Sequence, residues 1–202
     1  SRAARLDDGI VRLQAKGGTL VMTAAPLAPQ SLLDPTPTVL AMRMVPIDPE
    51  LECDLCVNAS ALEAADPTSV LLPDVAVNAA WAGITPPRTG WELADSVAAS
   101  EFAARAHAGI AEVAQSLPAD SGEEIVRTIR AAVWGASEGT LANLPRGVAF
   151  GALMLGFIAG EEQAKIFART PWHRVSFARG HILVRNTVRS GLTAVRSTGA
   201  SL

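Results

Sequence analysis

Apolar and polar side chains alternate with a period of two along much of the first half of the chain, which is the pattern of half-buried strands. Leu40, Met42 and Met44, for example, occupy every second position of one such segment. Breaks rich in Pro, Asp and Ser separate the segments. The pattern predicts four strands, at residues 19–25, 38–47, 51–59 and 70–81. Only residues 48–50 lie between the second and the third, so we expect these two strands to pair antiparallel in a β-meander.

The residues before the first of these strands are polar and mixed. Ile10, Val11 and Leu13 predict a short amphipathic turn, which either packs on the domain or frays. We therefore divide the chain into a polar N-terminal segment, residues 1–17, and a single α+β domain, residues 18–202.

The apolar period lengthens to that of a helix after Gly90. Thr89 and Glu92 form a capping-box pattern at the start of this helix, and Pro118 ends it. Two further helices are expected at residues 120–135 and 144–168, and a β-hairpin at residues 172–185. Strands in the first half, about three helices in the second half and a C-terminal hairpin predict an α+β fold.

The composition favours a folded protein, because hydrophobic residues make up 49% of the chain and charged residues 18%. The longest apolar run, residues 147–160, is shorter than the about 20 residues of a membrane-spanning helix, so we expect no membrane insertion. Two cysteines and the absence of a secretory apolar segment predict a soluble cytoplasmic protein. Abundant Ala, with Arg in place of Lys, is typical of a GC-rich bacterial genome.

Cys53 and Cys56 have the spacing of a redox or metal motif, but no second such pair occurs. In a strand, residues three positions apart face opposite sides, so the two sulfurs are expected to diverge. The favoured interpretation makes Cys53 a small core residue and Cys56 a partly exposed thiol. We predict no metal site and no cofactor.

The segment that joins the last predicted strand to the first predicted helix is rich in Pro, Gly and Trp. A helix N-terminus presents unpaired N–H groups, so Arg88, Thr89 and Gly90 are candidates for holding a phosphate or carboxylate there. The alternative is a loop that Trp81 and Trp91 anchor to the sheet, with Arg88 solvated or paired with a neighbouring acid.

Charge is distributed unevenly along the chain. Residues 163–202 carry a charge of +7 and no acidic residue, and the rest carries −10, which gives the net charge of −3. Arg174, Arg179 and Arg185 are therefore expected to form a basic surface. Such a surface binds nucleic acid through phosphates, or docks against the acidic body of its own or a partner subunit. The acidic overall balance favours the second alternative.

A catalytic site would need polar groups that converge on one pocket. Asp74 or Asn78, from the last predicted strand, and His173 or Arg174, from the hairpin, are the candidates. His173 could also meet His181 across the hairpin, but the favoured interpretation is that both residues belong to a polar edge.

No stretch of the sequence carries a motif that identifies a function. The leading hypothesis is a domain that self-associates through its helical part, as a homodimer, and binds a small anionic ligand at residues 88–92. The alternatives are a small enzyme with a polar site near the C-terminal hairpin, and nucleic-acid binding through the last 40 residues. Whether the chain is an enzyme, and which ligand it binds, are left open by the sequence.

Overall fold

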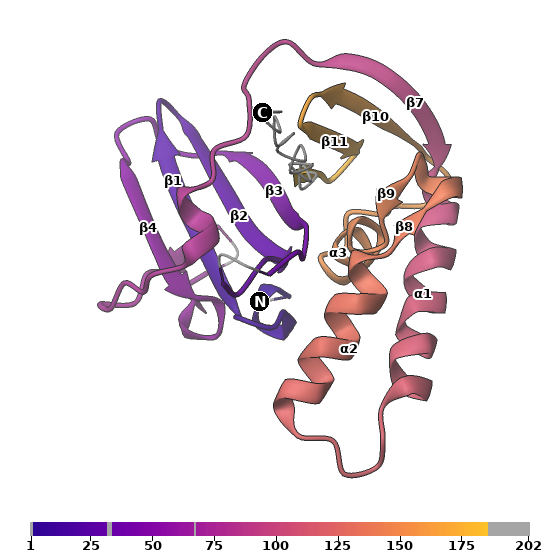
Figure 1. Ribbon diagram of the computed structural model, residues 1–202. Helices are drawn as coiled ribbons and strands as arrows, with labels where there is room; N and C mark the ends of the chain where they lie inside the picture. The colour runs from indigo at the N-terminus through magenta and orange to yellow at the C-terminus, as the bar shows by residue number, and fades with distance from the viewer. Residues whose placement is uncertain (1, 32–33, 67, 186–202) are drawn as a thin grey trace, which may run out of the picture.

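An eight-stranded antiparallel sheet organises the computed structural model, which describes residues 2–31, 34–66 and 68–185. The strand order is β4-β1-β2-β3-β12-β11-β10-β7. The strands are β1 (Ile10–Lys16), β2 (Thr19–Leu27), β3 (Thr38–Pro46), β4 (Cys53–Asn58), β7 (Glu92–Ala98), β10 (Gln163–Arg169), β11 (Trp172–Phe177) and β12 (Gly180–Arg185). The helices are α1 (Ala99–Ser116), α2 (Glu123–Gly135) and α3 (Gly147–Met154) (Figure 1). This architecture confirms the predicted α+β class, with the helices in the second half and a C-terminal hairpin.

The first strand was missed by the sequence analysis, which expected a turn around Ile10. Residues 10–16 instead form β1, which pairs with β2 across a turn at Gly17 and Gly18. Both glycines have positive φ, +55° and +77°, a conformation that costs other residues more because of their Cβ atom. The strand buries Val11 on the helix-covered side of the sheet.

The pairing predicted between residues 38–47 and 51–59 is wrong. Both segments are strands, but β4 pairs with β1, and β3 lies between β2 and β12. Both edges of β3 are therefore occupied. The short connection after β3 passes the end of the β1–β2 hairpin, where Ile47 N donates a hydrogen bond to Gly18 O.

The fourth predicted strand, at residues 70–81, is almost entirely absent. Only β6 (Val70–Leu71) forms, and it pairs with the equally short β5 (Glu63–Ala64) outside the main sheet. Pro73 lies two residues after the end of β6, and proline has no N–H to donate to a strand ladder. A 3₁₀ helix, η3 (Ala80–Gly83), ends the segment.

Two helix predictions need correction. Residues 92–98 form the edge strand β7, so α1 begins at Ala99, nine residues after Gly90, where the capping-box pattern at Thr89 and Glu92 predicts the helix to start. The third helix ends at Met154 instead of near Ala168, and β10 occupies the remaining residues. The loop between them contains Gly156 and Gly160 in the left-handed region, which stops helical propagation. Helix α2 lies within its predicted range, 120–135.

One face of the sheet carries the main core. The three helices pack there against strand residues such as Ile166, Val175 and Ile182, which are fully buried. Phe102 of α1 meets Phe177 of β11 edge to face, with ring centroids 5.3 Å apart. The two-residue strands β8 (Ser137–Glu138) and β9 (Leu144–Pro145) pair between α2 and α3. No helix among the described residues is long and apolar enough to cross a membrane.

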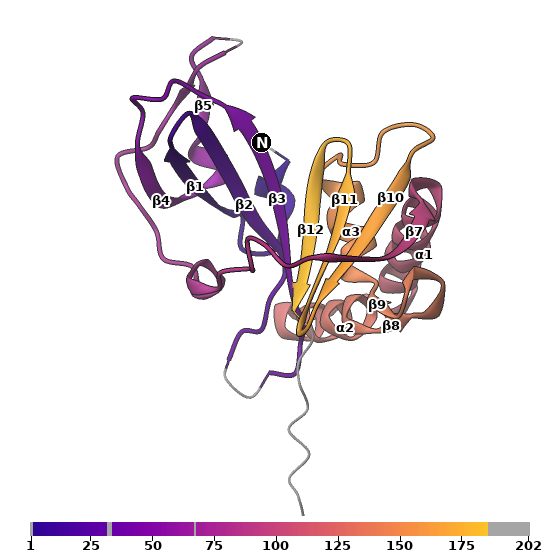
Figure 2. The same cartoon turned by 90° about the horizontal axis from the view of Figure 1, so that it is seen from above.

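The opposite face is crossed by a segment that we call the strap, residues 79–91. Strands β4 and β7 lie at opposite edges of the sheet, so the chain between them must pass over the whole sheet. Figure 2 shows the strap running across β3 and the C-terminal hairpin to reach β7. Trp81 and Trp91 pack into a second apolar cluster beneath it, with Leu40, Trp172 and Leu183.

Candidate ligand-binding site

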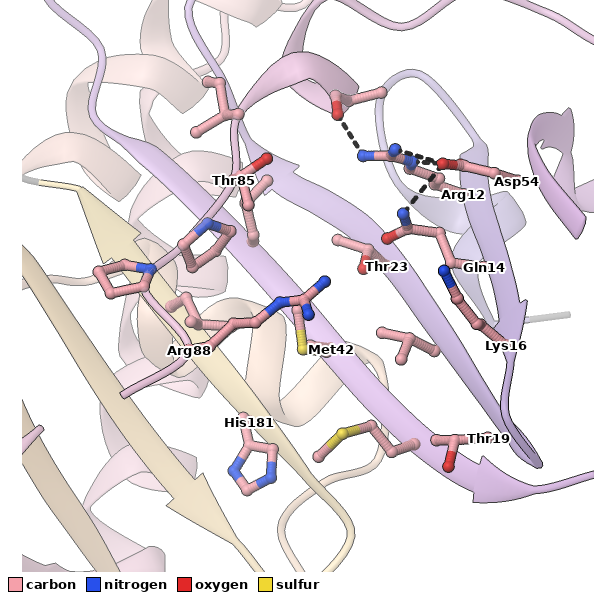
Figure 3. A pocket seen from close by; sticks show the side chains of 18 of the residues that line it. Arg12, Gln14, Lys16, Thr19, Thr23, Met42, Asp54, Thr85, Arg88 and His181 are labelled. Carbon is pink, nitrogen blue, oxygen red and sulfur yellow. Dashed lines mark hydrogen bonds and ion pairs between the residues drawn. The ribbon is translucent and has the colours of Figure 1, made fainter. Parts of the chain in front are cut away.

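A groove of about 970 Å³ lies between the strap and the uncovered face of the sheet. Strands β1, β2, β3 and β12 contribute its floor and one wall, and the strap contributes the other wall. Figure 3 shows the side chains that point into it. The volume is at the upper end of the range for small-molecule sites, which are usually 300–1,000 Å³.

The period-two alternation of the strands gives the groove its floor, because every second residue faces it. Val21 of β2, Leu40 and Met42 of β3 and Leu183 of β12 supply an apolar surface. Met44 continues this surface toward the open end, where its side chain is half exposed. Methionine side chains are flexible, so this floor adapts readily to an apolar group.

Cationic side chains surround the apolar floor. Lys16 comes from β1, Arg88 from the strap and Arg174 from β11, and the imidazole of His181 on β12 lies among them. In Figure 3, Arg88 reaches from the strap over Met42 into the groove, and His181 and Lys16 lie on either side of it. Three separate elements therefore bring positive charge to one groove.

Arg12 is also cationic, but its charge is balanced within the groove. Its Nε and Nη2 atoms each donate to Asp54, at 2.8 Å, in a bidentate pair, and Gln14 Nε2 donates to the same carboxylate. The hydrogen bond from Arg12 lowers the pKa of Asp54, and the pair raises the pKa of Arg12. Arg12 Nη1 also donates to Ala82 O, at 2.5 Å, which fastens the strap to β1.

Other contacts fix the strap above the sheet. Trp81 Nε1 donates to Asp8 Oδ2 at 2.6 Å, and the Trp81 ring is buried. Ahead of the strap, Val77 N donates to Cys56 O at the edge strand β4. Trp91 Nε1 donates to Pro87 O, closing the last turn of the strap. The two tryptophans therefore pack against the sheet as the sequence analysis expected of anchoring residues.

Arg174, predicted to be part of a basic surface, is partly buried. Its guanidinium lies over the rings of Trp91 and Phe167, 4.9 Å and 4.6 Å from their centroids. Burial lowers the pKa of Arg174, and its Nε atom has no hydrogen-bond partner. Arg179 and Arg185 are exposed. The three arginines therefore have different environments, and two other basic residues of the tail, Arg189 and Arg196, lie outside the described residues.

The two hairpin histidines do not face each other, which corrects the sequence hypothesis. His181 is opposite Ser176 in the β11–β12 register, and His173 is opposite Val184. His181 Nδ1 and Ser176 Oγ are 3.0 Å apart. Burial, followed by the nearby charge of Arg174, lowers the pKa of His181, which favours its neutral form.

The helix start that suggested an anion site at Arg88, Thr89 and Gly90 is absent, because these residues precede β7. Thr89 instead accepts a hydrogen bond through its carbonyl oxygen from Arg169 on β10. Gly90 has φ +75° at the turn into the strand. Of the three residues, only Arg88 lines the groove.

The two cysteines lie on β4 with their side chains on opposite faces of the sheet, as residues three apart must. Their expected burial is reversed, because Cys56 is buried and Cys53 is intermediate. Burial raises the pKa of the Cys56 thiol. In the described part of the chain, no three His, Cys, Asp or Glu residues gather as metal ligands.

The proposed catalytic partners are not brought together in the groove. Arg174 lines it, whereas Asp74, Asn78 and His173 do not. The sequence analysis also missed Arg12, Gln14 and Lys16, because β1 was interpreted as a turn. The available signal was their alternation with buried Val11, Leu13 and Ala15, directly before the Gly17–Gly18 turn.

Comparison with known protein families matched two consecutive segments. The domain of unknown function DUF8185 matches residues 86–189, and the domain of unknown function DUF8010 matches residues 1–83. The two segments meet inside the strap, so the groove is lined by residues of both. A search of curated proteins found no match.

Among solved structures, the chain is similar to a DnaN sliding clamp (DNA polymerase III subunit beta) from Bartonella birtlesii bound to griselimycin, at 10% identity and a TM-score of 0.45. It is also similar to a putative DNA polymerase III beta subunit from Eubacterium rectale, at 9% identity and a TM-score of 0.44. Each match covers 88% of this chain but only 56% of the other chain. Function is therefore inferred from the groove itself.

Proposed function

The chain belongs to the DUF8185 family, and we propose that it is a binding domain whose groove holds a small anionic ligand with an apolar body. The observation that supports this proposal is the convergence of Lys16, Arg88 and Arg174, from three elements, around an apolar floor. The sequence analysis expected the anion site at the start of a helix, whereas we propose it on the face of the sheet. Arg88 belongs to both proposed sites.

The charges in the groove favour an anion. The described ion pairs include Arg12 with Asp54, and none of them involves Lys16, Arg88 or Arg174. Among the described residues of the lining, Glu52 is the one other acidic residue. A carboxylate or phosphate group would therefore find cations that form no ion pair with a carboxylate of the described residues, and charge-assisted hydrogen bonds are the stronger kind.

The floor favours a ligand with an apolar part. Leu40, Met42 and Leu183 lie between the cationic groups, so an inorganic ion would leave this surface exposed to water. Burying an apolar group there contributes about 25 cal/mol per Å². We therefore expect an organic anion with an aliphatic or aromatic body to bind more tightly than phosphate alone.

Arg88→Ala tests the proposal directly. Decanoate and inorganic phosphate serve as probes, and binding is measured by isothermal titration calorimetry. We expect decanoate to bind the wild type, and Arg88→Ala to weaken that binding by about tenfold or more, because hydrogen bonds to charged groups contribute about 1.5–3 kcal/mol. Arg88 is exposed, so its removal should leave the melting temperature unchanged.

Arg43→Ala is the matched control. Arg43 is also an exposed arginine, but it lies between Met42 and Met44 on β3 and therefore points away from the groove. Equal losses of affinity in the two variants would show only a general charge effect. Failure of the wild type to bind either probe would refute the proposal.

A further inference from the structure

A short apolar hairpin projects from the sheet beside β4. We call it the protrusion: residues 62–66 and 68–76, which include β5 and β6. Figure 2 shows it extending beyond the end of the sheet. Its large apolar side chains are exposed: Val70 58%, Leu71 57%, Leu72 47% and Val75 70%. Four such residues within six positions form an unusual apolar surface for a projecting loop.

The protrusion is also acidic. It carries Glu63, Asp66 and Asp74, and residues 59–87 contain no lysine or arginine. Hydrogen bonds from Thr68 and Ser69 lower the pKa of Asp66 to about 2, so this carboxylate is charged at neutral pH. The protrusion therefore combines an apolar surface with negative charge.

These properties match those of the groove, which has an apolar floor among cationic side chains. We infer that the protrusion of a second copy of this chain occupies the groove, so that the protein self-associates through this contact. The inference rests on the proposed function, because it assigns a further occupant to the same anion-binding groove. A small anionic ligand would then compete with the second copy, and ligand binding would regulate assembly.

The protrusion of the same chain is not in a position to fill its own groove. None of the described residues that line the groove comes from the protrusion. The strap, which begins three residues after the protrusion, is fixed to the sheet by two hydrogen bonds. Trp81 donates to Asp8, and Arg12 donates to the carbonyl oxygen of Ala82. An anionic membrane surface is a poorer partner for the protrusion, because its carboxylates would be repelled.

The test is the mass of the full chain in solution, measured by sedimentation velocity over a range of concentrations. The wild type is expected to self-associate as concentration rises. Two variants should each remain monomeric: Leu71→Ser with Leu72→Ser, which changes the protrusion, and Arg88→Glu, which changes the groove. All three side chains are exposed, so the fold should be retained, and circular dichroism checks this.

Mixing the two variants separates a docking contact from an indirect effect. The mixture contains one intact protrusion and one intact groove, so it should form a one-to-one complex although neither variant self-associates. Leu93→Ser is the control, because Leu93 is 62% exposed on β7, outside both surfaces. This variant should associate like the wild type.

Three results would overturn the inference: a wild type that stays monomeric at every concentration, a protrusion variant that associates normally, or a mixture that forms no complex. The failure of this inference differs from that of the proposed function. Decanoate binding by a protein that stays monomeric would leave the groove function intact. Association that needs both surfaces but is insensitive to decanoate would support the docking contact and count against the ligand site.

Discussion

His181 lies at the junction of the groove and the buried sheet, and its surroundings determine its charge. Burial and the guanidinium of Arg174 both disfavour a second positive charge, so the pKa of His181 is below the ordinary histidine value of about 6.5. Its Nδ1 atom is within hydrogen-bonding distance of the Ser176 hydroxyl. Burial also lowers the pKa of His173. At the residue scale, burial in the sheet favours the neutral form of both histidines, and His181 is the one that lines the cationic groove.

This shift predicts a loss of stability in mild acid. In the window below pH 6.5 the unfolded chain binds more protons than the folded chain, so acid favours unfolding, and the loss continues down to the lowered folded pKa. Asp34 and Asp54, whose pKa values are lowered, stay ionised above about pH 5 and do not contribute in this window. Urea denaturation at a series of pH values measures the effect.

His181→Gln should reduce this pH dependence to the part that His173 contributes, because glutamine does not titrate and can still bond to Ser176. His107→Gln is the control, since His107 is exposed on α1. A wild-type stability that is constant between about pH 5 and pH 6.5 would contradict the prediction.

At the element scale, the helices that support the sheet depend on one close approach. Gly109 of α1 faces the ring of Trp134 on α2, which is only 2% exposed and stacks on Phe150 of α3 at 4.5 Å. A Cβ atom at position 109 would overlap the Trp134 ring. Because the Trp134 ring is buried and stacked on Phe150, it has little room to move away.

Gly109→Ala is therefore expected to lower the free energy of unfolding by about 1–3 kcal/mol, although alanine has the higher helix propensity. Chemical denaturation measures the change. Gly83→Ala is the control, because nothing lies within 4 Å of an added Cβ at that position. The control should stay within about 0.5 kcal/mol of the wild type. An unchanged or higher free energy of unfolding for Gly109→Ala would contradict the prediction, because it would show that α1 and α2 can move apart without loss of stability.

At the scale of the whole molecule, one sheet joins the two segments that match different families. Strand β3 belongs to the first segment and β12 to the second, and they pair from Thr38 to Met42. At this seam, Val39, Ile182 and Val184 are fully buried. Separating the segments would expose two unpaired strand edges together with these apolar side chains.

We therefore predict that residues 1–85 and residues 86–202 do not fold separately. Each fragment alone should give a collapsed amide spectrum by NMR, and co-expression of both should restore the dispersed spectrum of the whole chain. The single domain expected for residues 18–202 would then extend to β1. A cooperative unfolding transition in the isolated second fragment would instead indicate two independent domains.

Features that depend on local patterns were predictable from the sequence. Period-two alternation located β2, β3 and the β11–β12 hairpin. Acidic residues in the first turn, followed by apolar residues at helical spacing, located α2. Such signals are visible because neighbouring residues share one environment. Arg88 was likewise identified as a candidate, although for a helix start that the chain does not form.

Only the tertiary structure decided which strands pair and where the groove lies. The β4–β1 pairing and the use of residues 92–98 as the edge strand β7 depend on partners distant in the sequence. Placing β4 and β7 at opposite edges forces the strap across the sheet and brings Lys16, Arg88 and Arg174 together. The sequence by itself thus determined the fold class and most of the elements, because their signals are local. The tertiary structure decided the site, because its residues meet only through long-range pairing.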